Sequence, residues 1–104
     1  MPISTWANQS TFEYTGCVAI GTTIMFGTNR QAIVTTEQYE ALRNHFLGRV
    51  IPAGTDFQNP PPDSIGEWLL QHVSKTALAS YVAPILIREG YAIKETDTEL
   101  RIIR

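Results

Sequence analysis

The spacing of hydrophobic residues between Thr11 and Thr35 predicts β-strands. The segment "TFEYT" alternates polar and apolar positions, and "VAIGTTIMF" is rich in β-branched and aromatic residues. "QAIVT" follows "GTNR" at 27–30, a turn-like sequence whose Gly and Asn tolerate positive φ. We therefore predict an antiparallel hairpin or three-stranded meander over residues 11–35, preceded by a loose leader at 1–10.

The hydrophobic period becomes helical after Thr35. Thr35 and Gln38 have the spacing of a capping box, in which each side chain accepts a hydrogen bond from the other residue's backbone N–H. An apolar stripe follows, made of Tyr39, Leu42 and Phe46. Gly48 is expected to end this helix. Residues 49–51 then predict a short strand, and the proline-rich segment 52–63 predicts a stiff loop.

Two further helices are predicted downstream. Ser64 and Glu67 have the spacing of a second capping box. The apolar face behind them has helical spacing and consists of Ile65, Trp68, Leu69, His72 and Val73. The short turn "SKT" leads into a third helix over 76–89, which is expected to end at Gly90.

The last fourteen residues predict a β-hairpin around "TDT". A three-residue turn at 97–99 would place Glu95 opposite Arg101, a favourable pair of charges. A two-residue turn would instead place Lys94 opposite Arg101, which is unfavourable. We therefore expect the first register.

Together these elements predict a single α+β domain over residues 1–104. An N-terminal antiparallel hairpin or meander is followed, from 36 to 104, by a winged-helix-like three-helix segment with a C-terminal β-hairpin. The order helix, short strand, helix, turn, helix, hairpin resembles the winged helix, a variant of the helix-turn-helix DNA readers. This resemblance covers about two-thirds of the chain and rests on element order alone, so it concerns architecture more than function.

The third predicted helix has little polar surface. Nine of the twelve residues from Thr76 to Ile87 are apolar. At about 100° per residue, one side carries large residues and the other carries mainly small ones, including Ala79 and Ala83. Pro84 leaves the carbonyl of Ser80 without its usual helical donor. Either the N-terminal sheet or a second copy of the protein must cover the small-residue face.

Composition narrows the class of protein. A chain of 104 residues suits one domain with its own core, and a single cysteine, Cys17, excludes an internal disulfide. Charged residues make up 17%, below the usual ~25%, which agrees equally well with a surface covered by another subunit and with a chance excess of neutral polar residues. The net charge of −2 gives no general attraction to nucleic acid or anionic membranes. We expect a soluble, cytoplasmic protein without a signal peptide or membrane span.

No pattern of catalytic or metal-ligating residues stands out. His45 and His72 each lie beside apolar helical residues without a nearby acidic or thiol partner, so we expect partly buried structural histidines and not a metal site. Local sequence gives no support for a nucleophilic pair between Cys17 and a histidine. We expect no enzyme activity, no metal and no cofactor, and we expect Trp68 to lie in the core.

The first functional hypothesis is a small non-enzymatic binding or adaptor protein that acts as a homo-oligomer, most simply a two-fold homodimer. Two interfaces are considered: the small face of the third helix, and a terminal strand that pairs with its copy. The expected interface residues are Ala79, Ala83, Ile87 and Ile102.

Two alternatives remain. One is a winged-helix-like DNA-binding regulator, although the middle of the third helix lacks the Arg, Lys, Asn or Gln that read bases. Its expected nucleic-acid contacts are Lys75, Arg88, Lys94, Arg101 and Arg104. The other is a protein that binds an unknown small molecule in a pocket between sheet and helices, near Cys17 and Trp68.

Overall fold

A computed structural model describes residues 2–56 and 58–104; Met1 of the predicted leader and Phe57 of the predicted loop lie outside the described residues. The N-terminal part forms one antiparallel sheet with the strand order β1-β2-β3-β4. Its strands are β1 (Ile3–Ser4), β2 (Thr11–Cys17), β3 (Gly21–Phe26) and β4 (Arg30–Val34). Gly27 and Asn29 both have a φ of 58° in the β3–β4 turn, as their residue types suggested.

The segment expected to be a loose leader is held in place. Ile3 and Ser4 form β1 against Phe12 and Thr11 of β2. Trp6 is only 7% exposed. The burial of Trp6 could not be predicted from its polar neighbours in the sequence, because the residues that it contacts come from distant parts of the chain.

Three helices follow the first sheet, α1 (Thr36–Phe46), α2 (Ile65–His72) and α3 (Ala79–Arg88). The capping box of Thr35 and Gln38 at α1 is confirmed in both of its hydrogen bonds. At α2 only half of the expected box forms. Ser64 accepts from the backbone N–H of Glu67, whereas the Glu67 carboxylate accepts from Asp63 N–H instead of Ser64 N–H. α3 starts three residues later than predicted.

A second, smaller sheet closes the other end of the molecule, with β5 (Val50–Pro52), β6 (Ala92–Lys94) and β7 (Glu99–Ile102) in the order β5-β7-β6. Ile93 lies opposite Arg101, so both registers considered from the sequence are wrong. The Thr96 hydroxyl accepts from Thr98 and Glu99 N–H and makes a turn longer than we assumed. The favourable pair still forms diagonally, with Glu95 Oε1 2.9 Å from Arg101 Nε.

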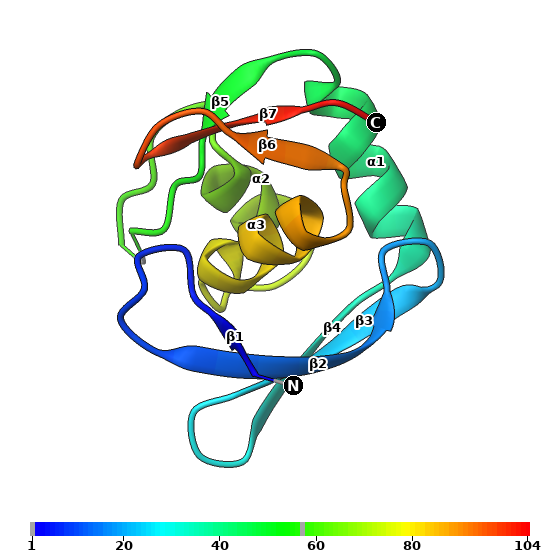
Figure 1. The fold of residues 1–104 in the computed structure, drawn as a ribbon, viewed down its shortest axis with the longest axis vertical. Helices are drawn as coiled ribbons and strands as arrows, with labels where there is room; N and C mark the ends of the chain where they lie inside the picture. The colour runs from blue at the N-terminus through cyan, green and yellow to red at the C-terminus, as the bar shows by residue number, and fades with distance from the viewer. Residues whose placement is uncertain (1, 57) are drawn as a thin grey trace.

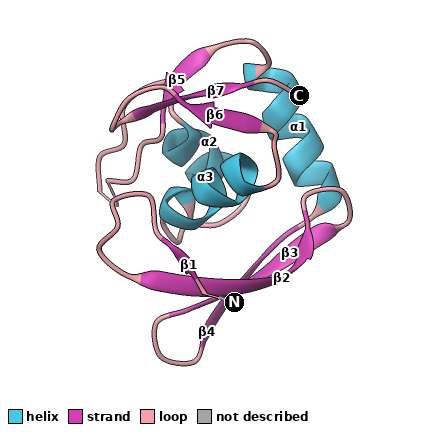
Figure 2. Cartoon of the chain, viewed as in Figure 1, coloured by secondary structure: helices cyan, strands magenta, loops and turns pink. Residues whose placement is uncertain are grey.

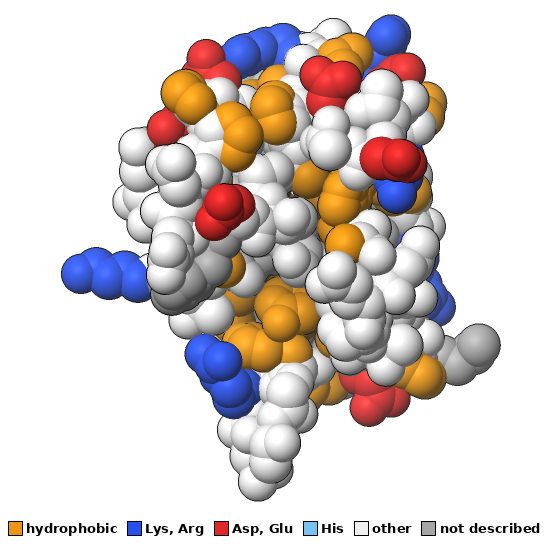
Figure 3. Space-filling model, turned by 90° about the vertical axis from the view of Figure 1, so that its left-hand side faces the viewer, with side chains coloured by type: hydrophobic (Ala, Val, Ile, Leu, Met, Phe, Trp, Pro, Cys, Tyr) orange, Lys and Arg blue, Asp and Glu red, His pale blue; other side chains and the backbone are white. Residues whose placement is uncertain are grey.

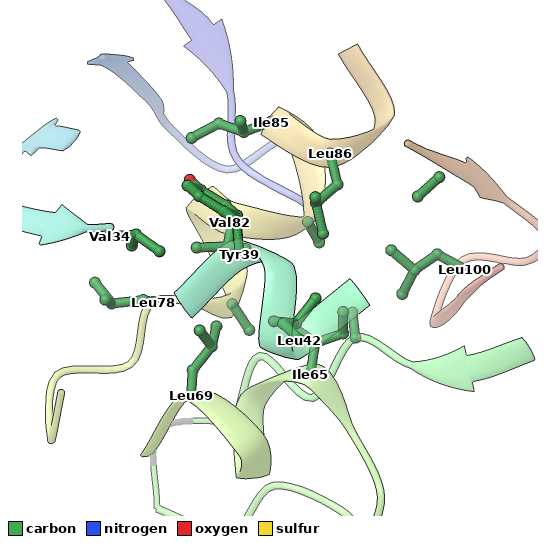
Figure 4. Close-up of a cluster of buried hydrophobic side chains, with 14 of the residues drawn as sticks. Val34, Tyr39, Leu42, Ile65, Leu69, Leu78, Val82, Ile85, Leu86 and Leu100 are labelled. Atoms are coloured by element: carbon green, nitrogen blue, oxygen red, sulfur yellow. The ribbon is translucent and has the colours of Figure 1, made fainter. Parts of the chain in front are cut away.

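The two sheets lie at opposite ends of the molecule with α3 between them and α1 along one side (Figure 1). Colouring by secondary structure makes the same layering visible, with helices between two layers of strands (Figure 2). The core forms where these layers meet, with side chains from α1, α2, α3, β4 and β7 pointing towards one another (Figure 4). No helix in 2–56 or 58–104 combines the length and apolar character needed to cross a membrane.

The N-terminal segment and its sheet cover α3 within one chain. The backbone N–H of Trp6 donates to the carbonyl of Ser80 at 3.0 Å, which replaces the donor that Pro84 removes. The Tyr81 ring packs on Phe12 and Phe26, with centroids 5.1 and 4.7 Å away. This part of the apolar surface of α3 is therefore covered within one chain, without a second subunit.

Candidate functional site

The outer face of the small sheet carries a cluster of exposed apolar side chains. Val50, Arg101 and Ile93 form one cross-strand row on β5, β7 and β6, and all three point to solvent. Ile103 continues this face beyond β7. Val50, Ile93 and Ile103 are 43%, 50% and 42% exposed. We call these three residues, with Arg101 among them, the sheet patch.

Charged groups surround the sheet patch. Seen from one side, hydrophobic side chains near the top of the molecule lie among Lys or Arg and Asp or Glu side chains (Figure 3). Beside the patch, the Tyr91 ring lies between two guanidinium groups, with Arg43 at 4.6 Å and Arg104 at 4.8 Å from its centroid. Arg43 Nε also donates to the backbone oxygen of Arg104 at 2.8 Å. The sheet patch thus combines exposed apolar side chains with Arg101 between them and with charged groups beside them. Exposed apolar side chains grouped on one face are a feature of protein-binding surfaces.

A second surface feature is a groove of about 410 Å³ between β1 and α3. Its walls come from β1 and the residues after it, the second half of α3, and the end of β6. They include Ile3, Trp6, Pro84 and Ile87 as apolar residues, and Arg88 and Lys94 as cations. Lys94 Nζ lies 4.6 Å above the Trp6 ring. We call this hollow the β1–α3 groove.

The residues expected at an oligomer interface are mostly buried inside the chain. Ala79 is 1% exposed, and Ala83 and Ile102 are fully buried. The expected pairing of the terminal strand with its copy is also wrong, because β7 is the central strand of its sheet and has a neighbour on each edge. Only Ile87 reaches the surface, in the β1–α3 groove.

The five expected nucleic-acid contacts are spread over three places. Lys75 lines a hollow beside Arg30 and the stacked rings of Phe26 and Tyr81. Arg88 and Lys94 line the β1–α3 groove. Arg101 and Arg104 lie on and beside the sheet patch. These cations lie on different elements, and the first sheet packs over the first half of the helix expected to read bases.

The residues considered for catalysis or metal binding do not gather. His45 and His72 were expected to be partly buried, but both are exposed. Each ring still packs on a neighbouring aromatic ring, with centroids 4.6 Å apart for His45 and Phe46 and 4.5 Å apart for His72 and Trp68. Cys17 is half-buried at the end of β2. Across the described ranges, no three His, Cys, Asp or Glu side chains come close enough to hold a metal ion. Trp68, at 8% exposure, lies in the core as predicted.

A partly buried hydrogen bond of Tyr14 accompanies a raised pKa of its hydroxyl group. The hydroxyl of Tyr14 on β2 donates to Glu89 at the end of α3 over 2.6 Å, and the other Glu89 oxygen accepts from Val18 N–H. Burial, and then the hydrogen bond to Glu89, raise the pKa of Tyr14 to about 12. This contact joins the first sheet to the end of α3. We assign it a structural role.

Trp6 was not singled out from the sequence. In the structure this residue lies at the centre of the contacts between the N-terminal segment, α3 and β6. A tryptophan in a predicted loose leader was the available signal, because so large an apolar side chain is rarely left in water.

Comparison with known proteins finds no matching family model, no matching curated protein and no matching solved structure.

Proposed function

We propose that this protein is a small non-enzymatic binding module that works in the cytoplasm as a two-fold homodimer, joined through the sheet patch. The observation that carries the proposal is the row of Val50, Arg101 and Ile93, extended by Ile103. Single exposed apolar residues are ordinary on soluble proteins, whereas neighbours on one flat face mark an interaction surface.

A second copy is the partner that the charges favour. The patch carries Arg101 beside Glu95, and Glu99 lies on the same strand one row away. A two-fold axis brings the same surface onto itself, so a patch with both signs of charge complements its own copy. A face with one sign only would favour a partner of opposite charge.

The proposal is tested by the mass of the protein in solution. At about 100 μM, above the Kd of a modest interface, the unmodified protein should sediment as a dimer. Ile93→Glu should give a folded monomer, because it replaces one of the three exposed apolar side chains of the sheet patch with a charge. The matched control is Ile33→Glu on β4, where an exposed isoleucine lies on the other sheet, 66% exposed. A parent protein that sediments as a monomer would refute the proposal.

DNA binding is a second candidate, and the order of the elements and strands favours it. We propose that residues 36–104 are a winged-helix variant, supported by the element order and by the strand order β5-β7-β6. Two features oppose DNA binding: the sheet packed over α3, and three acidic residues at the β6–β7 turn, Glu95, Asp97 and Glu99. Retention on immobilised DNA that falls steeply with salt would raise this candidate above the first.

A further inference from the structure

The β1–α3 groove lies beside a backbone hydrogen bond that joins the N-terminal segment to α3. Trp6 N–H reaches the Ser80 carbonyl that Pro84 leaves free. One helical turn further along, Pro84 and Ile87 face β1 across the groove without such a contact. The groove is therefore bounded by a strand edge on one side and a helix on the other.

The strand edge carries free backbone groups. Thr5 N–H donates to the Ser10 carbonyl, so residues 5 and 10 form a hydrogen-bonded pair. In an antiparallel ladder such pairs alternate with non-hydrogen-bonded ones, so Ile3 bonds to Phe12 while Ser4 does not bond to Thr11. The N–H and carbonyl of Ser4 consequently point away from β2, on the side from which Trp6 N–H reaches α3. An incoming extended chain could pair with them.

The cations of the groove have no carboxylate partner. The ion pairs within the described residues join Arg49 to Asp63 and Arg101 to Glu95, and neither involves Arg88 or Lys94. No Asp or Glu lines the groove. This local excess of positive charge occurs in a chain of net charge −2. An occupant that brings a carboxylate to Arg88 and Lys94 would meet complementary charge.

We propose that the β1–α3 groove binds an extended peptide segment of a partner protein, in which an apolar residue lies next to an acidic one. The peptide backbone pairs with the free N–H and carbonyl of Ser4. The apolar side chain lies against Pro84, Ile87 and the Trp6 ring, and the carboxylate lies between Arg88 and Lys94. A volume of about 410 Å³ is within the range of ligand sites.

A peptide fits these features better than a free amphipathic acid. Strand addition supplies main-chain hydrogen bonds, and alternate side chains supply specificity. A fatty acid would satisfy the apolar wall and the cations but would leave both Ser4 groups to water. The site does not include Val50, Ile93 or Ile103, so it stands independently of the proposed homodimer.

The test starts from a phage library of random heptapeptides selected on the full-length protein. We expect the enriched sequences to share an apolar residue beside Asp or Glu. The best sequence is then made as a synthetic peptide. It should bind the variants Arg88→Gln and Lys94→Gln about tenfold or more weakly than it binds the parent protein, because each substitution removes one charge-assisted contact. The matched controls are Arg30→Gln and Lys75→Gln, which remove the cation pair of another hollow and should change affinity less than about twofold.

Two further measurements separate the backbone contribution from the other contacts. Ser4→Pro removes an N–H that no strand partner uses, so it should lower the affinity for the peptide by about fivefold or more. The thermal midpoint of the variant is measured to verify that it folds. Octanoate should bind at least about tenfold more weakly than the peptide. The proposal is overturned if no peptide is enriched, if the enriched sequences lack an acid, if Arg88→Gln and Lys94→Gln bind like the parent, or if octanoate binds as tightly as the peptide.

Discussion

Replacing Trp6 by alanine tests whether the N-terminal segment is part of the folded domain. Trp6 makes three kinds of contact: its backbone N–H bonds to Ser80, its indole Nε1–H donates to the carbonyl of Asp97 at 2.7 Å, and its ring lies under Lys94. The substitution keeps the first contact and removes the other two, together with the buried ring. A loose leader would show no effect on stability.

The expected loss of stability follows from the burial of the ring. A side chain that is 7% exposed removes roughly 200 Å² from water, worth about 5 kcal/mol at ~25 cal/mol per Å². Residual compactness of the denatured chain lowers this to about 3–4 kcal/mol. The indole hydrogen bond and the Lys94 contact add about 1 kcal/mol together, since both lie near solvent. Trp6→Ala should therefore cost about 4–5 kcal/mol.

Urea denaturation followed by far-UV circular dichroism measures this loss. With an m-value of about 1.5 kcal/mol per M, the midpoint should fall by roughly 3 M. If that variant does not fold, Trp6→Phe is the alternative, with an expected cost of about 1–2 kcal/mol from the lost indole N–H and smaller ring. The control is Ile20→Ala, at a side chain 74% exposed, which should change stability by less than about 0.5 kcal/mol. A change below about 1 kcal/mol for Trp6→Ala would refute the reasoning.

Four other outcomes are expected. Trp68→Ala should cost about 3–5 kcal/mol in urea denaturation, because it empties a core site 8% exposed. Ala83→Arg should unfold the protein rather than separate subunits, since that position is fully buried within one chain, and a folded monomer by circular dichroism and sedimentation would contradict this. Gly66→Ala should cost about 1–3 kcal/mol, because the added Cβ overlaps the carbonyl oxygen of Gly54, and an unchanged urea midpoint would show that the backbone yields freely. The pKa of Tyr14 in the folded protein, about 12, lies above its usual 10.0. Its contribution to the stability of the fold is therefore complete below pH 10.0 and is lost as the pH rises through about 12. Absorbance titration of the folded protein should show a late phenolate step that is missing in Tyr14→Phe.

The elements that the sequence predicted correctly depend on neighbours along the chain. The stripe of α1, the capping box at Thr35 and the turn containing Gly27 all follow from residues within a few positions of one another. The mixed α+β character follows from the same local patterns. The predicted register of β6 and β7 was wrong because the Thr96 hydroxyl accepts two backbone N–H bonds and stabilises a longer turn. The charge pairs used to choose a register carry no information on the length of the turn.

The candidate sites depended on contacts between distant segments. The sheet patch needs β5 beside β7, and the β1–α3 groove needs the N-terminal segment beside a helix near the other end of the chain. Ala79 and Ala83, predicted at a homodimer interface on α3, are buried inside the chain for the same reason: their small side chains suit close packing, but the sequence does not identify the packing partner. The first sheet and the N-terminal segment occupy that place.

Pro84 shows the division most clearly. The sequence by itself determined that the Ser80 carbonyl lacks its helical donor, because proline has no N–H wherever it occurs. Only the tertiary structure decided that Trp6 N–H replaces it, and that a groove opens beyond this contact. A hydrogen bond requires two groups about 3 Å apart in space, and their separation along the chain places no limit on which groups those are.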